Sequence, residues 1–324
     1  MLLSGPFFSF VYEPLFQSNF YLGILVGAIY IALVFLAMAG VVETYLERLS
    51  RYSDFEYGRV RLWGSLGWAS TALFGGLLIN MGGEVIFWVA SAIAMIPMSI
   101  LFIVKIDTSE QSAPSGSSTP RLSDIVTVLK LPKFYFLALF VLGVATIYTV
   151  YDQQFPVFYA ALFVVKTGNE MYGYLNLLQI FLEAAGFLVA PTIVNRIGVK
   201  AGLLLAGAIM VLRIFCSAVL HDEVLLSLVK LLHAVELPIL MVSVFKYLNM
   251  HFDSKLSSTL YLISFMFVMQ LGAGAMAPVF GELYDVYSFQ YVYLIMSGIA
   301  IACLILSAVL LEKDNHRKHQ MPAV

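Results

Sequence analysis

The sequence has few charged residues: Asp, Glu, Lys and Arg make up 12 % of the chain, whereas 61 % of its residues are hydrophobic. The mean hydropathy of +0.90 excludes an ordinary soluble globular domain. Runs of about 20 apolar residues recur along the chain, each long enough to cross ~30 Å of hydrocarbon. Continuous runs also argue against a membrane β-barrel, whose strands would alternate apolar and polar residues. The sequence therefore predicts an all-α polytopic membrane protein.

Cysteine is scarce as well. Cys216 and Cys303 both lie in apolar runs, so we expect them to have packing roles and no disulfide framework. The chain has no paired-cysteine motif, no HExxH and no Gly-x-Ser-x-Gly elbow, which argues against a membrane-embedded enzyme. We expect no catalytic residue, no metal site, no cofactor and no nucleic-acid partner.

The apolar runs define nine expected membrane spans. They are Phe20–Leu46, Val60–Asn80, Val85–Val104, Phe134–Phe158, Tyr172–Val194, Ala201–Leu220, Val224–Asn249, Ser257–Phe280 and Tyr287–Leu311. The preceding segment, 1–16, is too short to span, because we expect its helix to break at Pro6 and at Glu13-Pro14. It lacks the basic region and cleavage site of a secretory signal. We interpret it as the second half of a helix whose beginning is absent.

Lys and Arg are distributed unevenly between the two sides of the membrane. When alternate connections are counted, one side holds fifteen of these residues and the other holds only Lys166. The positive-inside rule therefore places the tail, 312–324, in the cytoplasm. The connection 107–132 lies on the same side, and its Ser-, Pro- and Thr-rich part predicts a flexible cytoplasmic linker.

This linker divides the chain unequally. We expect a partial N-terminal helix bundle over 1–106, with a stub and three spans, and a C-terminal six-helix bundle over 133–311. A six-plus-six transporter that lacks its first two and a half helices would show this asymmetry.

Eight ionisable residues lie within the expected spans or near their ends. They are Glu43, Arg61, Asp152, Glu183, Arg213, Lys230, His233 and Glu236. A charged side chain at the bilayer centre costs at least ~2.5–3.5 kcal/mol, so each needs a partner or a function. A single one could form a structural ion pair or extend to the interface. Eight together are expected to face a shared interior or a water-filled cavity.

Three of these residues lie close together in "VKLLHAVELP". At ~100° per residue, Lys230, His233 and Glu236 fall within ~120° of one helix face, and Pro238 permits a kink. Histidine titrates near neutral pH, which suits proton handling. The alternative is structural, with Lys230 paired to Asp152 and His233 fixed by a hydrogen bond, and the two interpretations are compatible.

Two other segments carry residue types that bind sugars. In "TIYTVYDQQFPVFY", Asp152 and two glutamines lie among aromatic residues that could stack on a pyranose ring, although an interfacial aromatic belt is the alternative. In "VETYLERLSRYSDFEYGRVRLWGSLGWAS", Glu43 and Arg61 can pair with each other or bind hydroxyl groups. Trp68 could supply a further stacking surface.

At these residues the chain resembles the oligosaccharide:proton symporters of the major facilitator superfamily, the group of lactose, raffinose and sucrose permeases. The similarity covers essentially the whole chain. It is carried by "FEYGRVRLWGSLGW", "YDQQFPVFY", "IVNRIGVK", "VLRIFCS", "VKLLHAVELPILMVSVFKY" and "SSTLYLISF". The resemblance implies the major facilitator fold without its first two and a half helices.

The resemblance also implies roles for individual residues. It implies that Glu43 and Arg61 bind the sugar, with Trp68 stacking beneath it. Asp152 and Glu183 complete our candidate substrate-binding set.

For the proton, the resemblance implies a coupling set of Arg213, His233 and Glu236, in which Glu236 carries the proton. Lys230 would form a charge pair with Asp152.

Three departures narrow the expected substrate. Lactose-type members carry an aspartate where this chain has Thr149 and a lysine where it has Met269, so both partners of that ion pair are absent here. They also carry a glutamate where this chain has Ile180, and Glu183 lies about one helical turn further on. This pattern looks more like the sucrose permeases.

We therefore expect proton-coupled symport of a disaccharide, with sucrose as the expected sugar, by alternating access. The expected location is the bacterial inner membrane, as a multi-pass monomer with a cytoplasmic C-terminus. Its partners would be the sugar, the proton and the lipid bilayer. The alternatives are a permease for lactose, raffinose or another galactoside, and an inactive truncated fragment of such a carrier.

Overall fold

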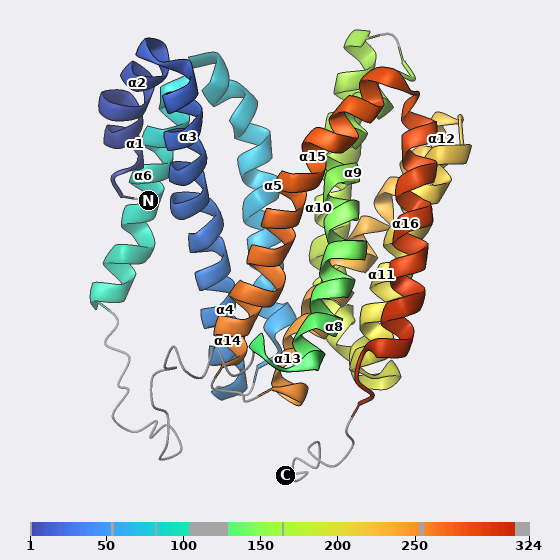
Figure 1. Ribbon diagram of the computed structural model, residues 1–324. Helices are drawn as coiled ribbons and strands as arrows, with labels where there is room; N and C mark the ends of the chain where they lie inside the picture. The colour runs from blue at the N-terminus through green and yellow to red at the C-terminus, as the bar shows by residue number, and fades with distance from the viewer. Residues whose placement is uncertain are drawn as a thin grey trace. The chain divides into compact units, whose positions relative to one another are not determined.

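The computed structural model describes residues 2–52, 55–81, 83–103, 129–163, 165–252 and 256–314, which form helices joined by short connections (Figure 1). The α-helices and the π-helical segments, labelled η, are α1 Ser4–Phe7, η1 Phe8–Tyr12, α2 Glu13–Ser18, α3 Phe20–Ile31, η2 Ala32–Leu36, α4 Ala37–Tyr52, α5 Tyr57–Met81, α6 Gly83–Ile103, α8 Pro132–Phe140, η3 Val141–Thr146, α9 Ile147–Ala160, α10 Val165–Ile197, α11 Val199–Val219, α12 Glu223–Leu231, α13 His233–His251, α14 Ser257–Leu260, η4 Tyr261–Phe267, α15 Val268–Val286 and α16 Phe289–Leu310. The described residues contain no β-strand. This is the all-α fold that the composition predicts.

Seven helical stretches in the described ranges are long and apolar enough to cross a membrane. They are Phe20–Glu47, Pro132–Ala160, Met171–Ile197, Val199–Val219, Glu223–His251, Tyr261–Val286 and Phe289–Leu310. They match seven of the nine expected spans. The expected spans Val60–Asn80 and Val85–Val104 coincide with α5 and α6, which are not among the seven, and the apolar part of α6, Glu84–Ser99, is shorter than the others.

Large apolar side chains are exposed along the outer faces of these helices. Examples are Ile305 and Val309 on α16 and Leu271 on α15, with Val309 77 % exposed. A soluble monomer rarely exposes contiguous apolar surface of this kind. These faces are suited to contact with lipid chains.

The N-terminal segment is helical where we expected breaks. The elements α1, η1 and α2 follow one another without a gap over 4–18, so the predicted breaks at Pro6 and at Glu13-Pro14 are wrong. Pro6 lies in the first turn, where N–H groups have no intrahelical partner. Before Pro14, the N–H of Glu13 bonds to the carbonyl of Phe8, so the hydrogen-bond pattern has already changed to the π-helical one. The helix ends at Asn19, whose side chain caps α3.

The chain forms two compact units. Met1–Thr44 with Trp68–Thr119 form the first, and Tyr45–Gly67 with Pro120–Val324 form the second. The second unit holds α8 to α16, the C-terminal end of α4 and the N-terminal end of α5. The expected domain boundaries stay a prediction, since 104–128 and 315–324, which include most of the expected linker and tail, lie outside the described residues.

In the second unit, α11 packs against both α13 and α16, and α10 packs against α13 (Figure 1). The close approach of α10 to α13 requires a glycine. A Cβ at Gly186 would lie 2.1 Å from the carbonyl oxygen of Ala234. Pro238, four residues after Ala234, has no N–H to bond this carbonyl. Gly186 therefore gives α13 room to keep a proline within a packed interface.

Gly58 of α5 faces a carbonyl of α10 that lies four residues before a proline, as Gly186 does on α13. A Cβ there would lie 2.1 Å from the carbonyl oxygen of Phe187, which is four residues before Pro191. The N-terminal end of α5 thus packs on α10 as α10 packs on α13.

Gly186→Ala is expected to lower the thermal stability of the purified protein, because the new methyl group would push the backbone of α10 away from Ala234. Overpacking of this kind costs about 1–3 kcal/mol. Gly173→Ala on the same helix is the matched control, since a Cβ at Gly173 meets nothing within 4 Å. It is expected to leave stability unchanged or raise it slightly. Equal unfolding temperatures in detergent for the two variants would contradict the packing argument.

Candidate functional site

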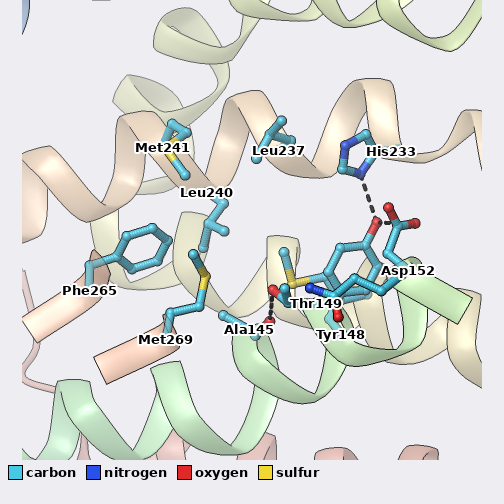
Figure 2. Close-up of a pocket in the computed structure, with 12 residues that line it drawn as sticks. Ala145, Tyr148, Thr149, Asp152, His233, Leu237, Leu240, Met241, Phe265 and Met269 are labelled. Carbon is cyan, nitrogen blue, oxygen red and sulfur yellow. Dashed lines mark hydrogen bonds between the residues drawn. The ribbon is translucent and has the colours of Figure 1, made fainter. Parts of the chain in front are cut away.

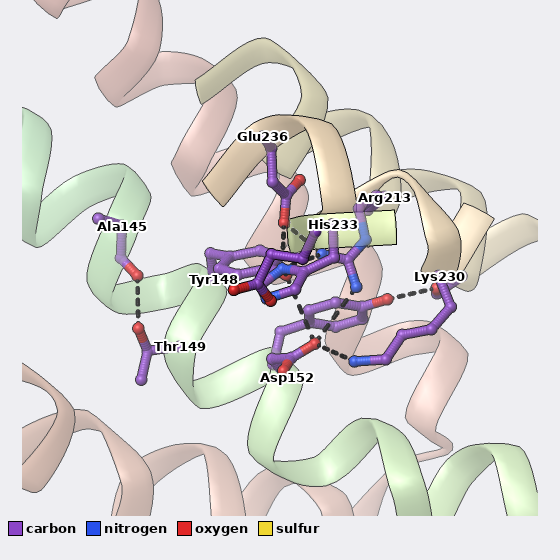
Figure 3. A network of polar contacts seen from close by, with 11 residues as sticks. Ala145, Tyr148, Thr149, Asp152, Arg213, Lys230, His233 and Glu236 are labelled. Carbon is purple, nitrogen blue, oxygen red and sulfur yellow. Dashed lines mark hydrogen bonds and ion pairs between the residues drawn. The ribbon is translucent and has the colours of Figure 1, made fainter. Parts of the chain in front are cut away.

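Three charged side chains are almost completely buried in the second unit. They are Arg213 on α11, Lys230 on α12 and Glu236 on α13, each at most 1 % exposed. Burial of an ion within protein is unfavourable unless partners and hydrogen bonds compensate for the lost hydration. The polar contacts in Figure 3 supply those partners.

The segment "VKLLHAVELP" is not one continuous helix. Helix α12 ends at Leu231 and α13 begins at His233, and the N–H of Leu232 bonds to Val229 in a tighter turn. The prediction of one helix face shared by Lys230, His233 and Glu236 is therefore wrong in this detail, because the turn separates Lys230 from the other two. Residues of neighbouring helices join them again.

Arg213 occupies the centre of the network. Its Nη1 donates to Oε1 of Glu236, and its Nη2 lies 3.3 Å from Oδ1 of Asp152. Lys230 Nζ donates to the same Asp152 oxygen at 2.8 Å, which is the ion pair expected from the sequence. Two cations and two carboxylates thus alternate along one connected chain.

Aromatic rings surround both cations. Arg213 Cζ lies 4.9 Å from the centre of the Tyr148 ring, and Lys230 Nζ lies 5.4 Å from that of Phe155. Such cation–π contacts stabilise a charge that has left water. The sequence favours an interfacial aromatic belt for Phe158 and Tyr159. Both are buried, so neither is exposed to lipid as a residue of such a belt would be.

His233 lies between two carboxylates. Its Nδ1 is 2.9 Å from Glu236 Oε1 and 2.7 Å from the Tyr148 hydroxyl, and its Nε2 is 4.0 Å from Glu183 Oε2. Arg213 Nη1 also lies 3.2 Å from Nδ1, so this nitrogen faces three polar groups while Nε2 faces Glu183. An imidazole can accept a proton at one nitrogen while it releases one from the other. The geometry places His233 within hydrogen-bond distance of Glu236, whereas Glu183 would have to move closer to exchange a proton with the imidazole directly.

Glu183 also contacts the N-terminal part of α5. Its Oε1 accepts a hydrogen bond of 2.7 Å from the hydroxyl of Ser65, and Arg61 Nη1 lies 3.4 Å from the same hydroxyl. The Arg61 guanidinium lies over the ring of Phe187, with 4.9 Å between Cζ and the ring centre. Arg61 is thereby connected to the carboxylate that neighbours His233.

The second unit brings together seven of the nine candidate residues. They are Arg61, Asp152, Glu183, Arg213, Lys230, His233 and Glu236. Glu43 and Trp68 belong to the first unit, where Glu43 is half-buried and Trp68 is exposed. Their expected roles stay predictions.

A cavity of about 250 Å³ lies beside the network (Figure 2). Polar groups of Tyr148, Asp152, Gln153 and His233 line one part of it. The remaining lining is mostly apolar and consists of Ala145, Thr149, Met210, Leu237, Leu240, Met241, Phe265 and Met269. The Thr149 hydroxyl donates to the Ala145 carbonyl at 2.8 Å. Thr149 and Met269 thus both line the cavity as uncharged residues.

Sequence reasoning missed two hydroxyl groups of the site. The sequence indicates Tyr148 only as one of the aromatic residues around Asp152, and it indicates no role for Ser65. Each lies four residues from a candidate residue on its own helix, Tyr148 from Asp152 and Ser65 from Arg61, which places it on the same face. That spacing was the available signal.

The described residues hold no cluster of three or more His, Cys, Asp or Glu side chains arranged to bind a metal ion. Cys216 and Cys303 are free thiols.

Comparison with known proteins finds sugar permeases and a proton/sugar symporter family. The family model described as LacY proton/sugar symporter matches residues 1–323. A sucrose permease of Escherichia coli is 39 % identical over 319 residues, which cover 98 % of this chain and 77 % of that protein. A lactose permease of Klebsiella oxytoca is 37 % identical over 318 residues, covering 96 % and 76 %. A raffinose permease of Escherichia coli is 36 % identical over 320 residues, covering 97 % and 75 %.

Asp152→Asn is expected to destabilise the protein, because Lys230 and Arg213 would lose an ionic partner while remaining buried. Removal of one partner from a fully buried pair costs about 3–5 kcal/mol. The loss is expected to be smaller here, because the Asp152 side chain is 29 % exposed and Arg213 keeps Glu236. The double variant Asp152→Asn with Lys230→Met removes the stranded ammonium group and is expected to recover part of that loss. Thermal unfolding of both variants in detergent checks this. If the double variant unfolds at the same temperature as the single one, Lys230 does not depend on Asp152.

Proposed function

The chain belongs to the LacY-type proton/sugar symporter family, and we propose that it carries sucrose across the bacterial inner membrane together with a proton. The observation that carries this proposal is the connected network in which buried Arg213 and Glu236 both contact His233 Nδ1, at 3.2 and 2.9 Å, while His233 Nε2 faces Glu183. A purely structural ion pair would not require a titratable imidazole between two carboxylates.

Glu236 is the proposed proton carrier. When ionised it neutralises Arg213, and its Oε2 is buried without a hydrogen-bond partner among the described residues. Protonation of Glu236 would remove the charge that holds the guanidinium, while Asp152 would still bind Arg213 from the other side. Proton binding thus favours a different arrangement of the same residues.

The proposed sugar-binding residues of the second unit are Arg61, Glu183 and Asp152. Sugar-binding roles for Glu43 and Trp68, in the first unit, are proposed from the resemblance alone. A guanidinium and a carboxylate can each form two hydrogen bonds to neighbouring hydroxyls of a pyranose ring. Glu183 contacts the Arg61 side through Ser65 and the proton side through His233. If sugar binding changes with the charge of Glu183, linkage requires that the sugar change proton affinity equally.

The choice of sucrose rests on three positions. Thr149 and Met269 line the cavity and cannot form an ion pair. The lactose-type members carry an aspartate and a lysine at these two positions. Ile180, where those members have a glutamate, is buried and apolar. Glu183 supplies a carboxylate one turn away. The identities of 36–39 % to permeases for different sugars do not separate the substrates by themselves.

We further propose that the chain acts as a monomer in the lipid bilayer, with its C-terminal tail, 312–324, in the cytoplasm. This orientation is supported by the concentration of Lys and Arg on one side of the expected spans.

Counterflow into proteoliposomes tests the substrate. Vesicles preloaded with unlabelled sucrose are expected to accumulate labelled sucrose transiently, and labelled lactose or raffinose is expected to enter much more slowly. Protein-free liposomes are the control. Faster entry of a galactoside than of sucrose would overturn the assignment of the sugar while leaving symport intact.

Glu236→Gln is expected to abolish uphill sucrose accumulation driven by a proton gradient, because the amide cannot carry the proton. Counterflow of sucrose is expected to persist, since exchange does not require the carrier to release a proton. Both are measured in the same proteoliposomes. Loss of counterflow in a correctly folded variant would contradict the role of Glu236 as proton carrier.

A further inference from the structure

Ser65 links two helices through a single hydroxyl group. It lies on α5 and is only 1 % exposed, and its Oγ donates to Glu183 Oε1 on α10 at 2.7 Å. On its other side, Arg61 Nη1 lies 3.4 Å from the same oxygen. Ser65 therefore stands between a guanidinium and a carboxylate.

The direction of these hydrogen bonds follows from the chemistry of the partners. A guanidinium can only donate, and an ionised carboxylate can only accept. With Glu183 ionised, the Ser65 hydrogen must point to Glu183 and a lone pair must face Arg61. A protonated Glu183 can itself donate to Ser65, which would release the serine hydrogen and remove the charge assistance from the bond.

The surroundings hold Arg61 in reach of this hydroxyl. A Cβ at Gly64 would lie 2.8 Å from Arg61 Nη1, so the glycine leaves room for the guanidinium to lie along α5 toward Ser65. The fully buried ring of Phe187 supports its other face. Arg61 is thus placed by its neighbours on α5 and α10, with Ser65 as the hydroxyl between it and Glu183.

We propose that Ser65 is a positioning residue that transmits the protonation state of Glu183 to Arg61, and so connects the proton-coupling set to the sugar site. This inference rests on the proposed function. Oε2 of Glu183 faces His233 at 4.0 Å, whereas Oε1 accepts the hydrogen bond of Ser65. One carboxylate thus neighbours both the proton-coupling set and the Ser65–Arg61 pair. Ser65 acts through Glu183 and Arg61 rather than on the proton.

The test compares Ser65→Ala and the nearly isosteric Ser65→Cys with Ser65→Thr, which restores a hydroxyl. Ser243→Ala is the matched control, because Ser243 is equally buried and its Oγ has no hydrogen-bond partner among the described residues. Sucrose affinity of each purified protein is measured from about pH 5 to 9, the range in which histidine and perturbed carboxylates titrate. Infrared difference spectra follow the protonated carboxyl band of Glu183, which is assigned by its loss in Glu183→Gln.

Ser65→Ala and Ser65→Cys are expected to weaken sucrose binding roughly tenfold, as for loss of a hydrogen bond to a charged group. Both are expected to change the pH profile of affinity and the titration of the Glu183 band. Ser65→Thr and Ser243→Ala are expected to keep the wild-type profiles.

Profiles and carboxyl bands of Ser65→Ala and Ser65→Cys that superimpose on those of the wild type would overturn the inference. Failure of the wild type to bind sucrose or any other disaccharide would overturn the proposed function separately. In that case the infrared titration still decides the role of Ser65, because it requires no sugar: an unaltered Glu183 band in both variants refutes it, and an altered band in both supports it.

Discussion

The buried guanidinium of Arg213 is the charge on which the helix packing of the second unit depends. A cation removed from water on all sides is tolerated only where carboxylates and aromatic faces replace its hydration. Asp152 from α9 and Glu236 from α13 do so, with the ring of Tyr148 beside it. Because these groups come from three helices, the electrostatic requirement of one side chain fixes how α9, α11 and α13 face one another.

Irregular backbone makes that convergence possible. A straight helix through 223–251 would carry Lys230, His233 and Glu236 on one face. The turn at Leu232 lets Lys230 bond to Asp152 while His233 and Glu236 contact Arg213. Farther along α13, the carbonyl of Ala234, which Pro238 has no N–H to bond, lies against Gly186. Proline and glycine thus act together, one interrupting the hydrogen-bond pattern and the other keeping the interrupted helix tightly packed.

The sequence predicted the fold class, seven of the spans and the residues of the charge network, because apolar runs and intramembrane charges are strong local signals. It did not predict the continuous helix through Pro6 and Pro14, since a shift to π-helical bonding depends on tertiary packing. Nor did it identify Ser65, because a serine on a helix is common and only the approach of Glu183 from α10 gives it a role. The resemblance implied the ion pair of Asp152 with Lys230 but not the second pair of Asp152 with Arg213.

The balance of charge in the network supports the proposal that a proton changes the arrangement of these residues. Arg213 and Lys230 are matched by Asp152 and Glu236, so the connected set is neutral when all four are ionised. A proton added to Glu236, or to His233 beside it, leaves one excess positive charge in a buried site. That excess is unfavourable in the arrangement described here and less so in one that admits water or an anionic partner. Among the described residues, Glu183 is a further carboxylate beside this set: it lies 4.0 Å from His233 and accepts the hydrogen bond of Ser65. Under the proposed function, a shift of its charge toward His233 would change the contact that Ser65 makes with Arg61.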